Sequence, residues 1–422
     1  MKSDERSLRI AMVAACPMPA RRGTPLRVER LAQALAARGH DVEVITYHLA
    51  EEEARYDFPI RRIFGRLELG TLAPGPTFAK LAVYDPALAK LVGRRLRDRP
   101  FDVVHAHHFE GLLAAAYGRR GTKVPIVYDA HTMLGAELPA YGKQWMSKLA
   151  RGFGRRLDQW IPALADHIVV VTDDISRQLS GHHGFDPHRI TVVPNGVEVD
   201  SFAAVSMDVG RPGLLVYTGT LAPYQGIDLM LSAFARALAA RPHLRLRLLI
   251  TASFEPFQPM AEQLGVAHAI EIIQDNFAAL PARLAEASVA LMPRVECPGL
   301  PQKLLNYMAA GKAIVSFAGS AKLLENEVTG LIVPNRDVKA FANAIIRLSD
   351  DQALALRLGA AARELILDTS SWDKAAERCE SVYANVLGAR AASMTAQEAD
   401  AAGLCRLPPA SLRREEQVTP VP

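Results

Sequence analysis

A lysine, a carboxylate and a run of backbone amides lie close together in the segment from Val289 to Val315. The short apolar run Val289–Pro293 is followed by a loop and then by apolar residues at helical spacing. A second apolar run, Ala313–Phe317, follows the glycine that ends this helix. The segment therefore predicts a strand, a helix and a parallel strand, and such a helix begins at the sheet edge where open α/β sheets bind ligands.

The loop and the start of this helix present charged side chains and backbone amides to one crevice. A helix N-terminus with a lysine suits a phosphate, and a nearby carboxylate suits sugar hydroxyls. The segment therefore predicts a site for a phosphorylated sugar. The residues that would form it are Arg294, Glu296, Gly299, Leu300, Pro301 and Lys303.

Length and composition limit the class of protein. The 422 residues exceed one ordinary core and suit two domains. Half of the residues are hydrophobic and 22% are charged, which is typical of a soluble folded chain, and the net charge of +4 argues against a dedicated nucleic-acid binder. The four cysteines lie far apart without metal-site spacing, which favours a reducing compartment.

No apolar run approaches the roughly 20 residues of a membrane span, and the first one, stopped by Pro17, is too short for a signal peptide. We therefore expect a cytoplasmic protein, at most peripheral to the inner face of the membrane. Residues 141–160 combine basic residues with an apolar helical stripe, which predicts contact with an anionic membrane surface. A helix that covers the domain with a solvated basic face is the alternative.

The rest of the chain alternates strands and helices, which predicts doubly wound α/β domains. The first domain opens with the strand Leu8–Ala15 and the helix Leu26–Arg38. Between them, Gly23 can let the backbone approach a phosphate, and Arg27 points to the same sheet edge. A plain surface turn and a solvated arginine are the alternatives for these two residues.

Two later strands end in histidines. Strand alternation places His105 and His107 on one face, so one can support the other. A His-x-His pair can also bind a metal, but no third ligand has a suitable spacing. The next strand leads to Asp129 and His131, which we expect on the crevice side. A helix cap formed by Asp129 or Thr132 is the alternative.

The chain leaves the first domain through an Asn-Gly pair. Asn195 and Gly196 predict a turn, because both residue types tolerate positive φ. A linker is expected at 203–212, and from 389 to 422 the composition, without periodicity, predicts a disordered tail.

These motifs resemble those of retaining glycosyltransferases of family 4, which have the GT-B fold. The resemblance rests on ITVVPNGV at 190–197, DVVHAH at 102–107, PQKLLNYMAAGK at 301–312 and ENEVTGLIV at 325–333. It implies two doubly wound Rossmann-like domains facing each other across a cleft. Residues 1–205 would form the acceptor domain, with a crossover helix at 372–388, and residues 206–371 the nucleotide-sugar donor domain.

The resemblance also implies roles for single residues. His107 would reach the transferred sugar, Glu296 would face the donor sugar, and Lys303 would stabilise the departing diphosphate. No metal or other cofactor is implied. His131 would lie on the acceptor side. The family's basic pair at the diphosphate and its ribose glutamate are replaced here, and the donor-binding residues would be Gly23, Arg27, Gly219, Thr220, Gln225, Arg294, Gly299, Leu300, Pro301 and Asn306.

The expected reaction moves a sugar from a nucleotide-sugar to a glycan or lipid-linked acceptor, in cell-envelope or surface polysaccharide biosynthesis. Two alternatives remain open. A GT-B-like nucleotide-sugar epimerase would use Glu296 and His107 as acid and base, and a non-catalytic glycosyltransferase-like subunit is suggested by the substitutions Thr220, Gln225 and Asn306. The sequence identifies neither the nucleotide nor the sugar nor the acceptor.

Overall fold

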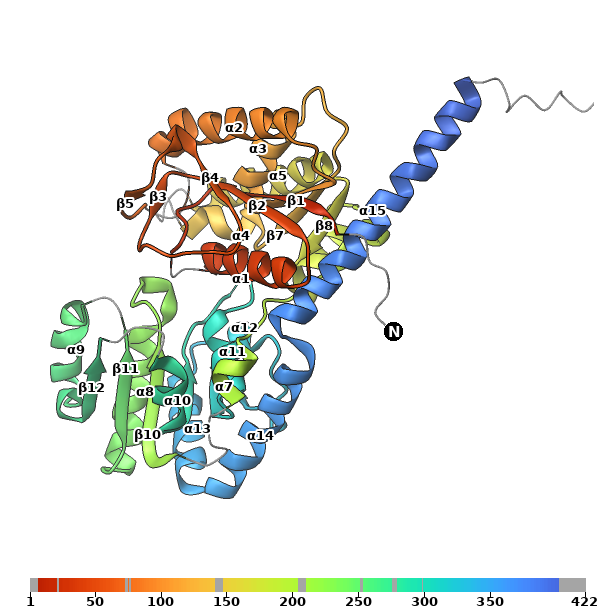
Figure 1. Ribbon diagram of the computed structural model, residues 1–422. Coiled ribbons are helices and arrows are strands. Elements are labelled where there is room, and N and C mark those ends of the chain that lie inside the picture. The colour runs from red at the N-terminus through yellow and green to blue at the C-terminus, as the bar shows by residue number, and fades with distance from the viewer. Residues whose placement is uncertain are drawn as a thin grey trace, which may run out of the picture.

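Two α/β domains face each other across a cleft (Figure 1). The computed structural model describes residues 7–20, 23–72, 75, 77–140, 147–203, 210–250, 253–274, 279–297 and 299–401. Each domain is a parallel sheet with helices on both faces, as the alternation of strands and helices predicts.

The first domain holds a seven-stranded parallel sheet in the order β4-β2-β1-β6-β7-β8-β9. Its strands are rich in apolar residues because both faces are covered, by α1 and α15 on one face and by α2, α3 and α5 on the other. A separate pair, β3 (Leu49–Ala50) and β5 (Glu68–Leu69), lies outside this sheet. The main strands are β1 (Arg9–Ala14), β2 (Asp41–Thr46), β4 (Ile60–Arg62), β6 (Val103–His107), β7 (Ile126–Ala130), β8 (His167–Val170) and β9 (Ile190–Val192).

The helices of this domain include one irregular start. A π turn, Lys80–Tyr84, directly precedes α2. The α-helices are α1 (Gly23–Ala37), α2 (Asp85–Asp98), α3 (His108–Gly118), α4 (Leu134–Glu137), α5 (Ser147–Trp160) and α6 (Asp173–Arg177).

The second domain holds a six-stranded parallel sheet in the order β12-β11-β10-β13-β14-β15. Its strands are β10 (Arg211–Thr218), β11 (Arg245–Leu249), β12 (Ile270–Ile273), β13 (Ala287–Met292), β14 (Ala313–Phe317) and β15 (Leu331–Val333). Its helices are α8 (Ile227–Ala240), α9 (Gln258–Gln263), α10 (Leu280–Ala285), α11 (Gln302–Ala309), α12 (Ala318–Ala321), α13 (Val338–Asp350) and α14 (Gln352–Thr369).

The strand order reverses between β1 and β6 in the first domain and between β10 and β13 in the second. Ligands of doubly wound sheets bind outside the carboxyl ends of the strands at such reversals. The predicted strand–helix–strand segment is confirmed as β13, α11 and β14, and Gly311, with φ of 64°, ends its helix in the left-handed region.

The chain enters the second domain earlier than predicted. Val197 and Phe202, the latter in α7 (Val199–Ala203), pack in the core of the second domain, so the domain boundary lies near Gly196 and not at 205. The predicted linker falls largely on residues 204–209, which lie outside the described residues.

The predicted turn at the Asn-Gly pair is not formed, and the pair instead lies where two segments come into close contact. Neither Asn195 nor Gly196 has positive φ. A Cβ atom at Gly196 would lie 2.5 Å from the backbone nitrogen of Trp372, so glycine is needed for close approach. Beside it, the Val197 amide donates to the Ser370 carbonyl at 2.8 Å, so the two segments that connect the domains run side by side.

The last helix, α15 (Trp372–Ala401), returns to the first domain as predicted. Trp372, Cys379 and Tyr383 pack in the same core as β1. The helix continues to Ala401 and its end projects away from both domains (Figure 1). The predicted disordered tail is therefore wrong for 389–401, and residues 402–422 lie outside the described residues.

Candidate active site

A cleft of about 1870 Å³ lies between the carboxyl edges of the two sheets. Pockets for one small ligand measure about 300–1,000 Å³, so this cleft has room for two substrates. Nearly all residues that the sequence analysis selected line it; His107 does not. The lining residues among them are Gly23, Arg27, His131, Gly219, Thr220, Gln225, Arg294, Glu296, Gly299, Leu300, Pro301, Lys303 and Asn306.

Lys303, in the first turn of α11, places an amine on the wall of the cleft that the second domain forms, called the donor wall below. Its Nζ donates to the hydroxyl of Tyr217 at 2.9 Å and to Oε1 of Gln225 at 2.9 Å. A Cβ atom at Gly219 would lie 2.8 Å from this Nζ, so the glycine leaves room for the lysine. No carboxylate of the described residues forms an ion pair with Lys303. Burial, and then the charge of Arg294, lower the pKa of Lys303 to about 7.

Arg294 places a second positive charge on the donor wall. Its Nε donates to the Glu296 carbonyl at 2.7 Å, and its guanidinium lies 4.7 Å from the ring centre of Tyr224, a cation–π contact. The Glu296 side chain is exposed to the cleft. A Cβ atom at Gly319 would lie 1.9 Å from the Val295 carbonyl, so the next loop packs tightly against this segment and holds it in place.

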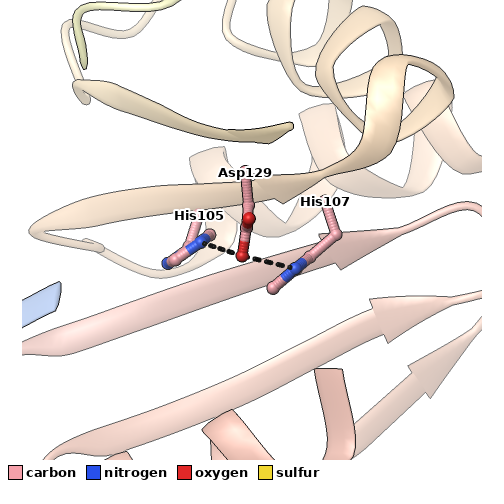
Figure 2. Close-up of side chains that lie close together, drawn as sticks. All are labelled: His105, His107 and Asp129. Atoms are coloured by element: carbon pink, nitrogen blue, oxygen red, sulfur yellow. Dashed lines mark hydrogen bonds and ion pairs between the residues drawn. The ribbon is translucent and has the colours of Figure 1, made fainter. Parts of the chain in front are cut away.

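A buried polar cluster lies beneath the wall of the first domain. Arg27 donates from Nε to Oδ2 of Asp129 at 2.8 Å, and both residues are buried. Nε2 of His105 and Nδ1 of His107 both lie 3.3 Å from the same oxygen, as Figure 2 shows. Although burial opposes ionisation, Arg27 and the histidines hold the pKa of Asp129 well below its usual range. Tyr383 of α15 completes the cluster, with its hydroxyl 2.5 Å from Nδ1 of His105.

His105, His107 and Asp129 together have the composition of a metal site. Their ligand-type atoms lie within 4.8 Å of one another, and the fold supplies a third candidate ligand that sequence spacing did not reveal. The Arg27 guanidinium, however, already bonds the carboxylate oxygen that both histidines approach, and its charge repels a cation. We therefore assign the three residues to hydrogen bonding, and the absence of a metal cofactor stays a prediction.

His131, not His107, reaches the surface of the cleft. His107 is fully buried with its ring stacked on His105, and burial lowers its pKa to about 3, so it is neutral. His131 lies on the cleft wall with Nε2 3.3 Å from Nδ1 of His107 and Nδ1 3.1 Å from Oγ1 of Thr24. The geometry favours His131 as the residue that meets a substrate and His107 as its support. Neither Asp129 nor Thr132 caps a helix, since Met133 precedes α4.

A second charged network lies in the first-domain half of the cleft. Nζ of Lys80 lies 2.8 Å from Oε1 of Glu110. His108, in the left-handed region with φ of 61°, bonds Glu110 through Nδ1 and Glu137 through Nε2, the latter at 2.9 Å. Burial would lower the pKa of His108, but Glu137 and Glu110 raise it to about 10. Two cations thus face two carboxylates. Sequence reasoning missed this network because its members come from separate elements; Glu110, two residues after His108, was the available signal.

Helix α5 forms part of the wall of the first-domain half of the cleft. Arg151 and Arg155 line the cleft, and the described residues offer neither of them a carboxylate within ion-pair distance. On the opposite face, Leu149, Phe153 and Trp160 are 72%, 62% and 74% exposed. Residues 141–146, where the predicted amphipathic stretch begins, lie outside the described residues. None of the described helices is long and apolar enough to cross a bilayer.

Both domains match models of known protein families. The model described as Glycosyltransferase Family 4 matches residues 22–201, and the one described as Glycosyl transferases group 1 matches residues 212–351. The chain belongs to glycosyltransferase family 4. The predicted family, and with it the class of enzyme, are thereby confirmed.

This family 4 protein is similar to D-inositol 3-phosphate glycosyltransferases. The protein of that name from Geodermatophilus obscurus is 31% identical over 58% of each chain. The one from Acidothermus cellulolyticus is 29% identical over 90% of this chain and 89% of its own length.

Solved structures confirm the GT-B fold. Sucrose-phosphate synthase from Thermosynechococcus elongatus superimposes with a TM-score of 0.75 at 18% identity, covering 91% of this chain and 100% of that one. Anabaena HepE, solved in complex with UDP and glucose, superimposes with a TM-score of 0.65 at 15% identity, covering 88% and 98%.

Proposed function

We propose that this protein is a retaining glycosyltransferase that moves a sugar from a nucleotide-sugar to an acceptor bound on the first domain. The observation that carries the proposal is Lys303, a half-buried amine with only neutral hydrogen-bond partners at the start of a helix in the cleft. Such a group is suited to an anion, and the donor diphosphate is one. HepE binds UDP and UDP-glucose, so a uridine nucleotide is the first donor to test.

The chemistry needs charge stabilisation at the leaving group. The bond between the anomeric carbon and the diphosphate oxygen breaks, its electron pair stays on the diphosphate, and Lys303 and Arg294 stabilise the charge. The acceptor hydroxyl attacks the same face of the sugar and gives its proton to the departing phosphate oxygen. Glu296 fixes the hydroxyls of the sugar, and His131 contacts its other side. The products are the glycosylated acceptor and a nucleoside diphosphate.

Gln225 and Arg294 together account for the altered diphosphate motif. Gln225 is neutral, but its Oε1 accepts from Lys303 and orients that amine. Arg294, in the loop between β13 and α11, supplies the second charge. A cation–π contact with Tyr224 and a hydrogen bond to the Glu296 carbonyl hold its side chain in place. The substitutions at Thr220 and Gln225 are therefore compatible with catalysis, which disfavours the non-catalytic subunit.

We propose a lipid-linked acceptor at the cytoplasmic face of an anionic membrane. On α5, Arg151 and Arg155 face the cleft and suit a phosphate ester, while Leu149, Phe153 and Trp160 face outward and suit the lipid interface. A soluble phosphorylated polyol is the second candidate acceptor, because the relatives are named D-inositol 3-phosphate glycosyltransferases. The exposed apolar face favours the lipid, and with it a role in envelope or surface polysaccharide synthesis.

A donor and acceptor panel tests the proposal. Thermal stabilisation by UDP-, GDP- and ADP-sugars identifies the donor, because a ligand of the native state raises the unfolding midpoint. The labelled donor is then incubated with lipid-linked saccharides, with D-inositol 3-phosphate, and without acceptor. Transfer to the lipid-linked saccharides with retained configuration supports the proposal. An epimerised donor without acceptor favours the epimerase, and stabilisation by none of the nucleotides favours the non-catalytic subunit.

A further inference from the structure

One side chain joins the donor loop to the buried histidine cluster. The carboxamide of Asn195 lies between the domains: its Oδ1 accepts from Nη1 of Arg27 at 2.9 Å, and its Nδ2 donates to the carbonyl of Leu300 at 3.4 Å. The orientation of the amide is fixed by chemistry, because arginine only donates and a carbonyl only accepts. An aspartate at this position would keep the arginine as a partner but turn an oxygen towards Leu300.

Both ends of this connection belong to the catalytic cleft. Leu300 lies in the loop that leads into α11, three residues before Lys303. Arg27 is 2% exposed, and each of its three guanidinium nitrogens donates a hydrogen bond, to Asp129, to Asn195 and to the Val193 carbonyl at 3.0 Å. Asp129 in turn holds the histidines behind the first-domain wall.

The facing walls approach closely at the same point. A Cβ atom at Gly299 would lie 2.9 Å from the His131 carbonyl, so the donor loop and the loop of the cleft histidine are in contact. A shift of the donor loop by a fraction of an ångström therefore changes the distance between the donor sugar and the acceptor wall. Misplacement of about 1 Å can reduce a rate by about a hundredfold.

From this arrangement we infer that Asn195 is a positioning residue, which fixes the position of the donor loop relative to the wall that carries His131. It does so through its hydrogen bonds to Leu300 of the donor loop and to Arg27 of the first domain. The inference rests on the proposed function. Oδ1 and Nδ2 of Asn195 both bond groups of the protein, so we expect its loss to affect the transfer step more than donor affinity. A donor sugar held out of register with the acceptor is also exposed to water, and hydrolysis of the donor then competes with transfer.

The Asn195→Asp variant isolates the bond to Leu300, because it keeps a partner for Arg27. We expect kcat for transfer to fall at least about tenfold and the ratio of donor hydrolysis to transfer to rise by a similar factor. The calorimetric Kd for UDP-glucose should stay within about twofold. The control is Lys322→Met, which removes another interdomain contact, to Asp174 at 3.3 Å, and should leave the hydrolysis ratio at its wild-type value.

The outcomes separate the two proposals. If the wild-type protein transfers no sugar, the proposed function fails. If the wild type is active and Asn195→Asp matches it in kcat and in hydrolysis ratio, Asn195 has no positioning role. A raised Kd with unchanged kcat would instead make Asn195 a donor contact and overturn the inference. Should the aspartate variant misfold, Asn195→Ser, which shortens the side chain without adding charge, must show the same split between kcat and Kd or the inference is rejected.

Discussion

The affinity for a nucleotide-sugar should depend on pH through Lys303. In the free protein the pKa of this lysine is lowered to about 7 by burial, whereas its ordinary value is 10.5. A diphosphate in contact with the amine should raise the pKa of Lys303 again, since an opposite charge favours the protonated form. Binding near and above pH 7 must therefore take up a proton, and the complex should weaken as the pH rises.

The size of the effect follows from the two pKa values. At pH 6 the free lysine is almost fully protonated, and binding needs no further proton. At pH 8.5, which is 1.5 units above a pKa of about 7, only about one molecule in thirty is protonated. The Kd for UDP-glucose should therefore rise about thirtyfold between these pH values, or by about 2 kcal/mol. The lowered pKa has the opposite effect on the stability of the ligand-free protein. The free energy of unfolding rises between pH 7 and 10.5, because in this range the unfolded chain binds more protons than the folded one.

Isothermal calorimetry of UDP-glucose at pH 6.0, 7.0, 7.75 and 8.5 measures this directly. The sugar diphosphate does not titrate in this range, and the uracil ring keeps its proton. Repeating the titration in buffers with different ionisation enthalpies counts the protons taken up, which should approach one at pH 8.5. In Lys303→Met the Kd should be at least about tenfold higher at pH 6 and flat with pH. If that variant keeps the pH dependence of the wild type, Lys303 is not the group responsible and the reasoning is refuted.

Three further variants test separate parts of the molecule. Asp129→Asn leaves the Arg27 charge buried without its counter-ion and should lower the free energy of unfolding by about 3–5 kcal/mol in urea titrations; a loss under 1 kcal/mol would show that the pair does not stabilise the fold. Gly319→Ala places a methyl group 1.9 Å from the Val295 carbonyl and should raise the Kd for UDP-glucose at least about tenfold, as measured by calorimetry, because the Arg294 loop must move. Phe153→Glu, on a side chain 62% exposed, should reduce co-flotation with phosphatidylglycerol vesicles severalfold without changing the unfolding midpoint; unchanged flotation would remove α5 from the membrane surface.

Much of the donor side could be predicted from the sequence because it is local. The helix α11, its Gly311 end and Lys303 all follow from spacing within one segment, and the structure places them as expected. The family motif then supplied the remaining donor residues, which line the same cleft.

The acceptor side could not be predicted to the same degree because it is assembled from separate elements. Strand alternation showed that His105 and His107 share a face, but not that His131, directly after the next strand, would lie between His107 and the cleft. The network of Lys80, His108 and Glu137 needs the packing of three elements. At Asn195 the turn propensity was a poor guide, since tertiary contact and not positive φ governs that position.

The paired crossing segments constrain how the molecule can move. Val197 and Ser370 are hydrogen-bonded to each other where the chain leaves the first domain and where it returns to it. The two connecting segments are therefore joined along a single seam. We therefore expect an opening of the two domains to be a rotation about that seam. Asn195 lies beside this axis and is displaced least during the rotation, whereas parts of the lobes far from it travel furthest. Such a rotation would widen the cleft at its outer edge, where substrates would enter and products leave. The contacts of Asn195 between the two domains would be kept from one turnover to the next.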